Sequence, residues 1–214
     1  MRNKKIEKLS LISLSLLIVI SYILGFILNE NSAGGGVNDS EHIWSNLQIF
    51  LLHDLKSAIL HDNYYDSRSP AVYILHKYFN PFTDTFLNYR ISVFFLSFLV
   101  PIFFFILLSK KFLIKKKEYL LLIAFLIFLS PYFRTSAYWG LGENYGLFFL
   151  ILTSLSILNF NINNNNYLNI FFTCLFSSLA FYFDQKLLII PILSFIYILI
   201  NSTSSIEKYL SILF

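Results

Sequence analysis

A run of twenty uncharged, mostly apolar residues at positions 9–28 is the feature that most constrains this chain. A helix of about 20 such residues is long enough to cross the hydrocarbon core of a bilayer. Five more apolar blocks follow it, at about 91–109, 118–131, 144–160, 167–183 and 187–201. Soluble domains average about 45–50% apolar and 25% charged residues, whereas this chain is 57% hydrophobic and 13% charged. We therefore predict an all-α fold, a polytopic membrane helical bundle with about six transmembrane helices.

Several of these blocks are shorter than a full crossing, and the third is the weakest. It is compatible with a short or re-entrant helix packed inside the bundle. Residues 1–28 could instead be a cleaved signal peptide, but their apolar run exceeds the roughly 7–15 residues of a signal-peptide core. We therefore favour an uncleaved anchor helix.

Lysine and arginine placement predicts the orientation. The N-terminus is basic, and the link between the second and third blocks carries five lysines between residues 110 and 117. Both segments belong in the cytoplasm by the positive-inside rule. Residues 29–90, 132–143 and 184–186 then face outward. The net charge of +4 thus indicates membrane orientation and not nucleic-acid binding. We predict an integral protein of a bacterial inner membrane, with a cytoplasmic N-terminus.

The outward loop 29–90 contains helical patterns of its own. Apolar residues recur at helical spacing at Ile43, Leu47, Phe50, Leu51, Leu55, Ala58 and Ile59. This predicts an amphipathic helix at the membrane interface, and a weaker one spans 71–78 before Pro81 ends it. We expect residues 1–214 to form a single membrane domain with this extracytoplasmic loop of interfacial helices.

An acidic couplet, Asp39 and Glu41, stands at the start of that loop behind the glycines 34–36. A carboxylate there could act as a general base on an acceptor hydroxyl, with its neighbour positioning the acceptor or a metal. The alternative is helix capping, because Asn38, Asp39 and Ser40 are all favoured at helix N-termini.

The charged candidates beyond the couplet lie in the outward segments. They are Arg68, Arg90, Arg134, Glu143 and Lys186. Arginine suits phosphate oxygens because its donors form a planar fork. Arg134 could equally snorkel to the interface. Arg90 opens a helix against the dipole and should have a partner, either Asp84 or a phosphate.

Aromatic and histidine residues of these segments have simpler explanations. Tyr138 and Trp139 could stack on a sugar, but we favour interface anchors. The four histidines His42, His53, His61 and His76 show no zinc spacing, so we predict no metal site or cofactor, although a divalent metal stays possible.

Together these segments resemble the GT-C superfamily of membrane glycosyltransferases, especially protein O-mannosyltransferases and lipid A aminoarabinose transferases. The matching features are the couplet Asp39 and Glu41, the segment 61–73 with Ser69-Pro70, Arg90 opening the second span, the segment 130–143 ending in Glu143, and Lys186 before the sixth span. The chain departs from the family in having Ser69-Pro70 for a double proline and Glu143 for the commoner aspartate. Such enzymes also continue beyond six spans, so we expect a fragment, a split enzyme or a degenerate relative.

The resemblance implies an inverting transfer at the extracytoplasmic face. A sugar on a polyprenyl-phosphate carrier would be attacked by the hydroxyl of an unknown acceptor, with Asp39 as the base and Glu41 as its partner. Arg134 and Lys186 would stabilise the phosphate leaving group. The alternative is a non-catalytic membrane partner of a polysaccharide or lipid-sugar assembly system, or an inactive fragment.

Overall fold

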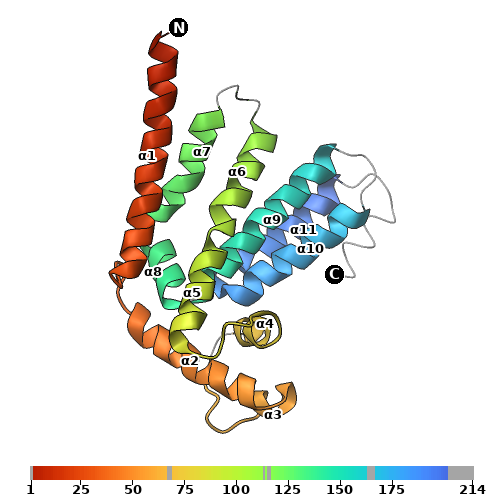
Figure 1. Ribbon diagram of the computed structural model, residues 1–214. Coiled ribbons are helices and arrows are strands. Elements are labelled where there is room, and N and C mark those ends of the chain that lie inside the picture. The colour runs from red at the N-terminus through yellow and green to blue at the C-terminus, as the bar shows by residue number, and fades with distance from the viewer. Residues whose placement is uncertain (1, 67–68, 113, 115–116, 163–166, 202–214) are drawn as a thin grey trace. The chain divides into compact units, whose positions relative to one another are not determined.

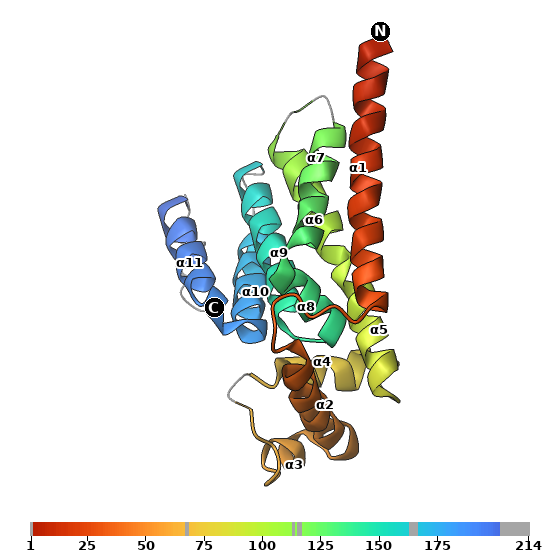
Figure 2. The same ribbon diagram turned by 90° about the vertical axis from the view of Figure 1, so that its left-hand side faces the viewer.

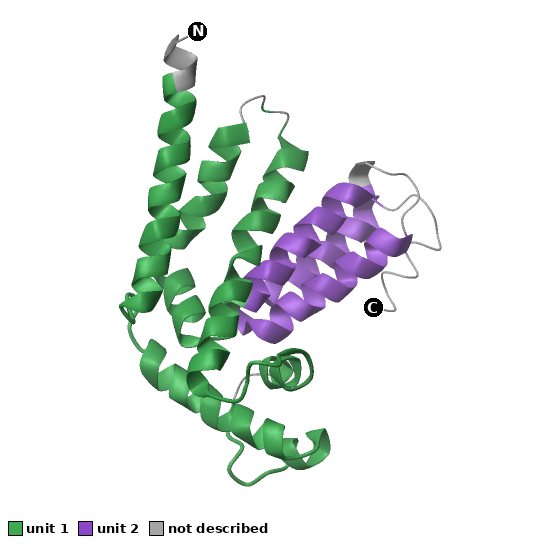
Figure 3. Ribbon diagram, in the orientation of Figure 1, with its two compact units in different colours: residues 1–144 green, residues 145–214 purple. Residues whose placement is uncertain are grey.

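The computed structural model describes residues 2–66, 69–112, 114, 117–162 and 167–201 (Figure 1). Within these ranges, all regular secondary structure is helical. The helices group into two compact units, residues 1–144 and 145–214 (Figure 3). Each unit is described below by itself.

The first unit is built on long apolar helices. They are α1 (Arg2–Ile27), α5 (Phe86–Ser97), α6 (Leu99–Lys111) and α7 (Lys117–Phe125), which continues into the 3-10 helix η1 (Leu126–Leu129). Helix α7 packs against both α1 and α6, and the three run side by side (Figures 1 and 2). The core is aromatic: the fully buried Tyr22 ring stacks on Phe128 at 4.1 Å and on Phe94 at 5.2 Å.

The loop after α1 folds into three short helices beyond the C-terminal end of α1 (Figure 2). They are α2 (Gly36–Leu52), α3 (Leu55–Ile59) and α4 (Ala71–Phe79). The sequence pattern predicted one helix through residue 59, but the chain breaks at His53, which is extended. Ile43, Leu47 and Phe50 form the buried side of α2, and α2 packs against α4. Whether these helices lie at a membrane interface stays a prediction.

Residues 132–143 were expected to be a link and instead contain α8 (Pro131–Trp139). The Ser130 hydroxyl accepts a hydrogen bond from the Phe133 N–H, and Pro131 occupies the first turn, so this helix has a well-formed start. It ends at Gly140, whose φ of 71° is in the left-handed region that favours glycine. The axis bends by 68° between the α7–η1 segment and α8.

In the part of the chain that the structure describes, three helical segments are long and apolar enough to cross a membrane: Ile6–Ile27, Phe86–Lys111 and Glu143–Phe160. The bent pair Lys117–Leu129 and Pro131–Trp139 makes a fourth if it counts as one broken span. This length and hydrophobicity indicate a membrane protein. The count of six spans, the sidedness and the bacterial inner membrane stay predictions.

The second unit contains most of α9 (Glu143–Ile162), α10 (Tyr167–Phe183), the 3-10 helix η2 (Gln185–Leu187) and α11 (Ile189–Asn201). Helices α10 and α11 are apolar but shorter than a full crossing. Gly146 allows a close approach, because a Cβ at this position would lie 2.7 Å from the Asp184 Cβ. The Phe149 and Phe183 rings also stack, with their centroids 5.4 Å apart.

Candidate functional site

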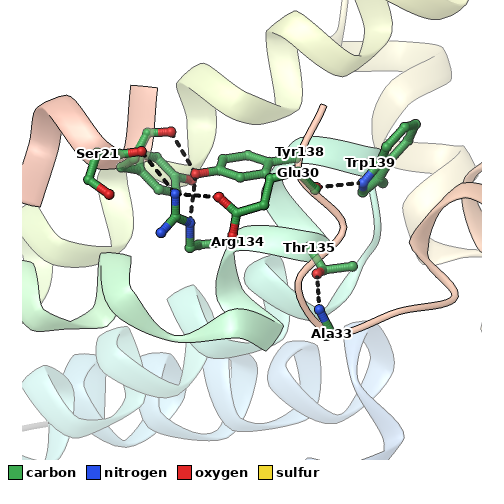
Figure 4. A network of polar contacts seen from close by, with 8 residues as sticks. Ser21, Glu30, Ala33, Arg134, Thr135, Tyr138 and Trp139 are labelled. Carbon is green, nitrogen blue, oxygen red and sulfur yellow. Dashed lines mark hydrogen bonds and ion pairs between the residues drawn. The ribbon is translucent and has the colours of Figure 1, made fainter. Parts of the chain in front are cut away.

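Arg134 of α8 binds the segment that follows α1, and it does so inside the protein. Its Nη2 lies 2.5 Å from the Glu30 carboxylate and donates to the Ser21 carbonyl at 2.9 Å, and its Nε donates to the Tyr138 hydroxyl at 3.0 Å (Figure 4). The Arg134 side chain is only 13% exposed. The sequence predicted that Arg134 either contacts a phosphate or snorkels to the interface, and neither interpretation included the ion pair with Glu30.

Helix α1 is shaped to receive this ion pair. A Cβ on Gly25 would lie 2.3 Å from Arg134 Nη2, 2.5 Å from Glu30 Oε2 and 2.6 Å from the Tyr138 hydroxyl. Such distances are far inside van der Waals contact, so the pair and a side chain at position 25 exclude each other. The Tyr138 hydroxyl donates in turn to the Tyr22 carbonyl at 2.6 Å.

Arg90 makes a second attachment to the same segment. Its Nη2 donates to Asn29 Oδ1 at 2.9 Å, its Nε donates to the Tyr138 carbonyl at 2.8 Å, and its guanidinium lies 4.1 Å from the Trp139 ring centroid. Arg90 is 8% exposed. Ring faces attract cations, and this attraction strengthens when water is excluded.

The expectation that Asp84 is the partner of Arg90 is wrong. Both Asp84 oxygens accept from the Asn88 amide, at 2.9 and 3.1 Å. These hydrogen bonds hold the pKa of the Asp84 carboxyl below its usual value. Among the described residues, no carboxylate lies within ion-pair distance of Arg90.

Backbone contacts complete the attachment of residues 28–36 to α8. The Trp139 Nε1 donates to the Glu30 carbonyl at 3.0 Å, and the Ala33 N–H donates to Thr135 Oγ1 at 3.1 Å (Figure 4). We call the set Arg90, Arg134, Asn29, Glu30 and Trp139 the arginine clasp. Tyr138 and Trp139 are buried, so the expectation that they are interface anchors is wrong.

The clasp leads directly into α2, where Gly36 is the first helical residue. The N-cap is Gly35, with φ 70°, and the Gly36 N–H donates to the side-chain oxygen of Asn31 at 3.2 Å. None of Asn38, Asp39 and Ser40 is the N-cap, because the helix starts before them, so this part of the capping explanation is wrong. A Cβ on Gly36 would lie 2.6 Å from Thr135, so α2 begins in close contact with α8.

Asp39 and Glu41 are both exposed on α2. Asp39 is in the first turn, where the helix dipole favours a carboxylate. Residues two apart on an α-helix differ by about 200° in direction. The two carboxylates of the couplet are therefore close in sequence but do not converge on one face, whereas Asp39 shares its face with His42, three residues on.

His42 is exposed and is held by a buried asparagine one turn further along α2. Asn46, which is 2% exposed, contacts His42 Nε2 through its Nδ2 at 3.1 Å. The same amide pairs with the backbone of Tyr65, accepting from its N–H at 3.4 Å and donating to its carbonyl at 3.2 Å. Asn46 therefore joins α2 to the segment before α4.

Helix α4 packs against α2 and contacts its C-terminal end. The buried Tyr73 hydroxyl donates to the Asp66 carboxylate, and burial is the main cause that raises the pKa of Tyr73. Lys77 donates to the carbonyls of Phe50 and His53, where α2 ends. A cation at a helix C-terminus satisfies carbonyls that lack helical partners and complements the dipole.

His76 of α4 is fully buried against the Tyr89 ring, with centroids 4.8 Å apart. Asn80 Oδ1 accepts from the Phe82 N–H at 3.0 Å, so its amide nitrogen must face His76 Nδ1, 2.8 Å away. Burial lowers the pKa of His76 to about 4. The ring is therefore neutral at pH 7 and packs as a core residue.

Of the other predicted site residues, Glu143 and Lys186 belong to elements other than α2. Glu143 begins α9, as expected, and its Oε2 accepts from the Ser136 hydroxyl at 3.3 Å. Lys186 is exposed in η2 of the second unit, where its N–H donates to Asp184 Oδ1 at 3.1 Å. Arg68 lies outside the described residues. Within the described ranges, no group of three or more His, Cys, Asp or Glu side chains could hold a metal ion.

Sequence reasoning missed Glu30, Asn29 and Asn46. One signal was present: Glu30 is the first carboxylate after the run 9–28, and a poorly solvated arginine needs a counter-charge. No local pattern indicated the asparagines, because their partners are distant in sequence.

No family model matches this chain, and comparisons with curated proteins and with solved structures find no significant match.

Proposed function

We propose that this protein is an inverting membrane glycosyltransferase that moves a sugar from a polyprenyl-phosphate carrier to an acceptor hydroxyl at the extracytoplasmic face. One observation carries the proposal: the exposed carboxylate of Asp39 lies on a helix whose start is attached to α8, close in sequence to the end of the first candidate span. The Gly36 contact with α8 and the arginine clasp provide that attachment. A general base at a membrane surface needs this combination of exposure and fixed position.

In the proposed reaction, Asp39 accepts the proton of the acceptor hydroxyl while the oxygen of that hydroxyl attacks the anomeric carbon of the donor. The bond from that carbon to the phosphate oxygen breaks, and the phosphate leaves with the electron pair. A cation at the phosphate stabilises the charge that develops. The sequence-based candidates for this cation are Lys186, which is exposed, and Arg68, which lies outside the described residues.

The geometry changes the roles proposed for three other residues. Arg134 and Arg90 are engaged in the clasp, so we propose that they position α2 and do not contact phosphate. Glu41 points away from the face of Asp39, which does not favour a metal bridging the two. We therefore propose no metal in this reaction.

The test is donor consumption by the full chain purified in detergent. The probes are farnesyl phosphates of mannose, glucose and arabinose, with water as the acceptor and released farnesyl phosphate measured by mass spectrometry. A general base typically contributes about 10²–10⁴-fold, so Asp39→Asn should lose that much activity. The matched control is Asp62→Asn, an exposed acid of the same loop, which should keep wild-type activity.

Two results would overturn the proposal. One is an Asp39→Asn protein that consumes donor as fast as the wild type. The other is a folded wild type that neither consumes any probe nor retains polyprenyl phosphate in native mass spectrometry. The second result would favour a non-catalytic partner of a lipid-sugar assembly system.

A further inference from the structure

The hydrogen bonds around Asn46 determine which nitrogen of His42 carries the proton. The Tyr65 N–H can only donate and the Tyr65 carbonyl can only accept. Asn46 must therefore turn Oδ1 to the first, at 3.4 Å, and Nδ2 to the second, at 3.2 Å. The atom that faces His42 Nε2 at 3.1 Å is then an N–H donor.

It follows that Nε2 of neutral His42 is an acceptor and that Nδ1 carries the hydrogen. Within the part of the chain that the structure describes, this Nδ1–H has no hydrogen-bond partner. His42 is exposed, so its donor faces the solvent side of α2. Asn46 is buried and makes two hydrogen bonds to the Tyr65 backbone. Its amide is thereby fixed, and this keeps the His42 ring in one orientation.

His42 also lies one helical turn after Asp39. Side chains three residues apart on a helix are neighbours, with Cβ atoms about 5–6 Å apart. A sugar hydroxyl or a phosphate oxygen that approaches Asp39 would therefore come within reach of the imidazole. A fixed N–H donor beside a carboxylate acceptor is a pair suited to a substrate with both hydroxyl donors and oxygen acceptors.

We propose that His42 contacts the lipid-linked sugar directly, donating from Nδ1–H to one of its oxygens beside the base Asp39. The proposal rests on the glycosyltransferase function proposed above and adds a residue to the same site. The histidine held by Asn46 thereby becomes part of substrate recognition, and the buried amide acts as its positioning residue.

Two substitutions distinguish the roles of the two ring nitrogens of His42. The side-chain nitrogen of asparagine can take the place of Nδ1, whereas the end of a glutamine reaches the position of Nε2. His42→Asn should therefore keep most of the donor turnover. His42→Gln keeps a group that can bond to Asn46 but loses the outward donor, and its kcat/KM should fall by about 10- to 100-fold, as for a hydrogen bond to a charged or partly charged oxygen.

The tautomer is measured independently of activity. Long-range proton–nitrogen NMR of histidine-labelled protein, with His42 assigned by its loss in His42→Gln, should show the Nδ1–H tautomer. In Asn46→Asp the new carboxylate can only accept, so the proton should move to Nε2, and turnover should fall with it.

The outcomes are distinct. An Nε2–H tautomer in the wild type would overturn the inference. So would a His42→Gln protein with wild-type turnover in an experiment where Asp39→Asn is inactive, and that result would leave the glycosyltransferase function standing. A folded wild type that neither consumes any of the farnesyl-phosphate sugars nor retains polyprenyl phosphate would overturn both.

Discussion

The arginine clasp predicts a specific coupling between Glu30 and Arg134. Their ion pair is short, at 2.5 Å, and the two side chains are 30% and 13% exposed. Exposed ion pairs contribute about 0.2–1 kcal/mol, whereas hydrogen bonds to charged groups that are shielded from water contribute about 1.5–3 kcal/mol. The burial of Arg134 places this pair in the second range, so a double-mutant cycle of Glu30→Ala and Arg134→Ala should give a coupling of about 2 kcal/mol.

The Glu30→Gln variant refines this expectation. Its side-chain oxygen can still accept from Arg134 but carries no charge, and neutral hydrogen bonds are about half as strong as charge-assisted ones. The loss of stability should therefore be about half of the loss in Glu30→Ala. A full loss in Glu30→Gln would mean that charge alone, and not hydrogen bonding, holds the pair.

The assay is unfolding by SDS in mixed micelles, followed by tryptophan fluorescence. Of the two tryptophans, Trp44 is replaced by Phe so that only Trp139 reports. Its Nε1 bonds to the Glu30 carbonyl, so its emission senses the clasp directly. The control cycle is Lys8 with Glu118, a pair of similar length, 2.7 Å, whose lysine is 61% exposed. It should give less than about 1 kcal/mol.

A coupling below about 0.5 kcal/mol at Glu30–Arg134, or one no larger than the control, would refute the reasoning. The clasp would then not stabilise the protein, and Arg134 would again be available as a phosphate ligand.

Three further predictions use the same unfolding assay. Gly25→Ala should lower the free energy of unfolding by about 1–3 kcal/mol through overpacking. The loss should be smaller in a background where Arg134 is already alanine, because the nearest of the three clashing side chains is then absent; additive losses would contradict this. Gly140→Ala should cost more than about 1 kcal/mol, since its φ is 71° and its Cβ would lie 2.6 Å from the Tyr89 ring, whereas Gly34→Ala, with open space around it, should show only the backbone strain. The pKa of His76 is about 4 in the folded protein and 6.5 for an unperturbed histidine, so the unfolded state binds more protons between these pH values. The contribution of neutral His76 to the free energy of unfolding should therefore be fully present above pH 6.5, and the free energy should fall by about 3 kcal/mol as the pH drops to 4. His76→Gln should flatten that slope, and an unchanged slope would assign it to other groups.

The helices were predictable because their signals are local. The apolar run 9–28 coincides with most of α1, the apolar block 91–109 lies within the segment Phe86–Lys111 that α5 and α6 form, and the pattern of 71–78 matches α4. The segment 132–143 was missed as a helix because its polar and aromatic residues resemble an exposed link. Its start signals, Ser130 and Pro131, were present and were given too little weight.

The contacts of the candidate site were not predictable in the same way. Arg134 bonds to a carbonyl 113 residues earlier in the chain, and Trp139 bonds to one 109 residues earlier. A single sequence shows that a buried arginine needs partners, but it does not show which distant groups provide them. The proposed Asp39–His42 face illustrates the difference: the spacing of three is local and visible, whereas the amide that orients the ring depends on Tyr65, 19 residues away from Asn46.

The clasp changes which experiment can test phosphate binding. An arginine that attaches residues 28–36 to α8 will reduce activity when it is replaced, because the start of α2 loses its support and Asp39 moves with it. Loss of activity in Arg134→Ala therefore does not distinguish a phosphate ligand from a positioning residue. Lys186 is the better position for this test, because it is exposed and is not part of the arginine clasp. If the donor phosphate meets a lysine there, Lys186→Ala should release the carrier while leaving the unfolding transition unchanged, and Arg134→Ala should shift the unfolding transition first.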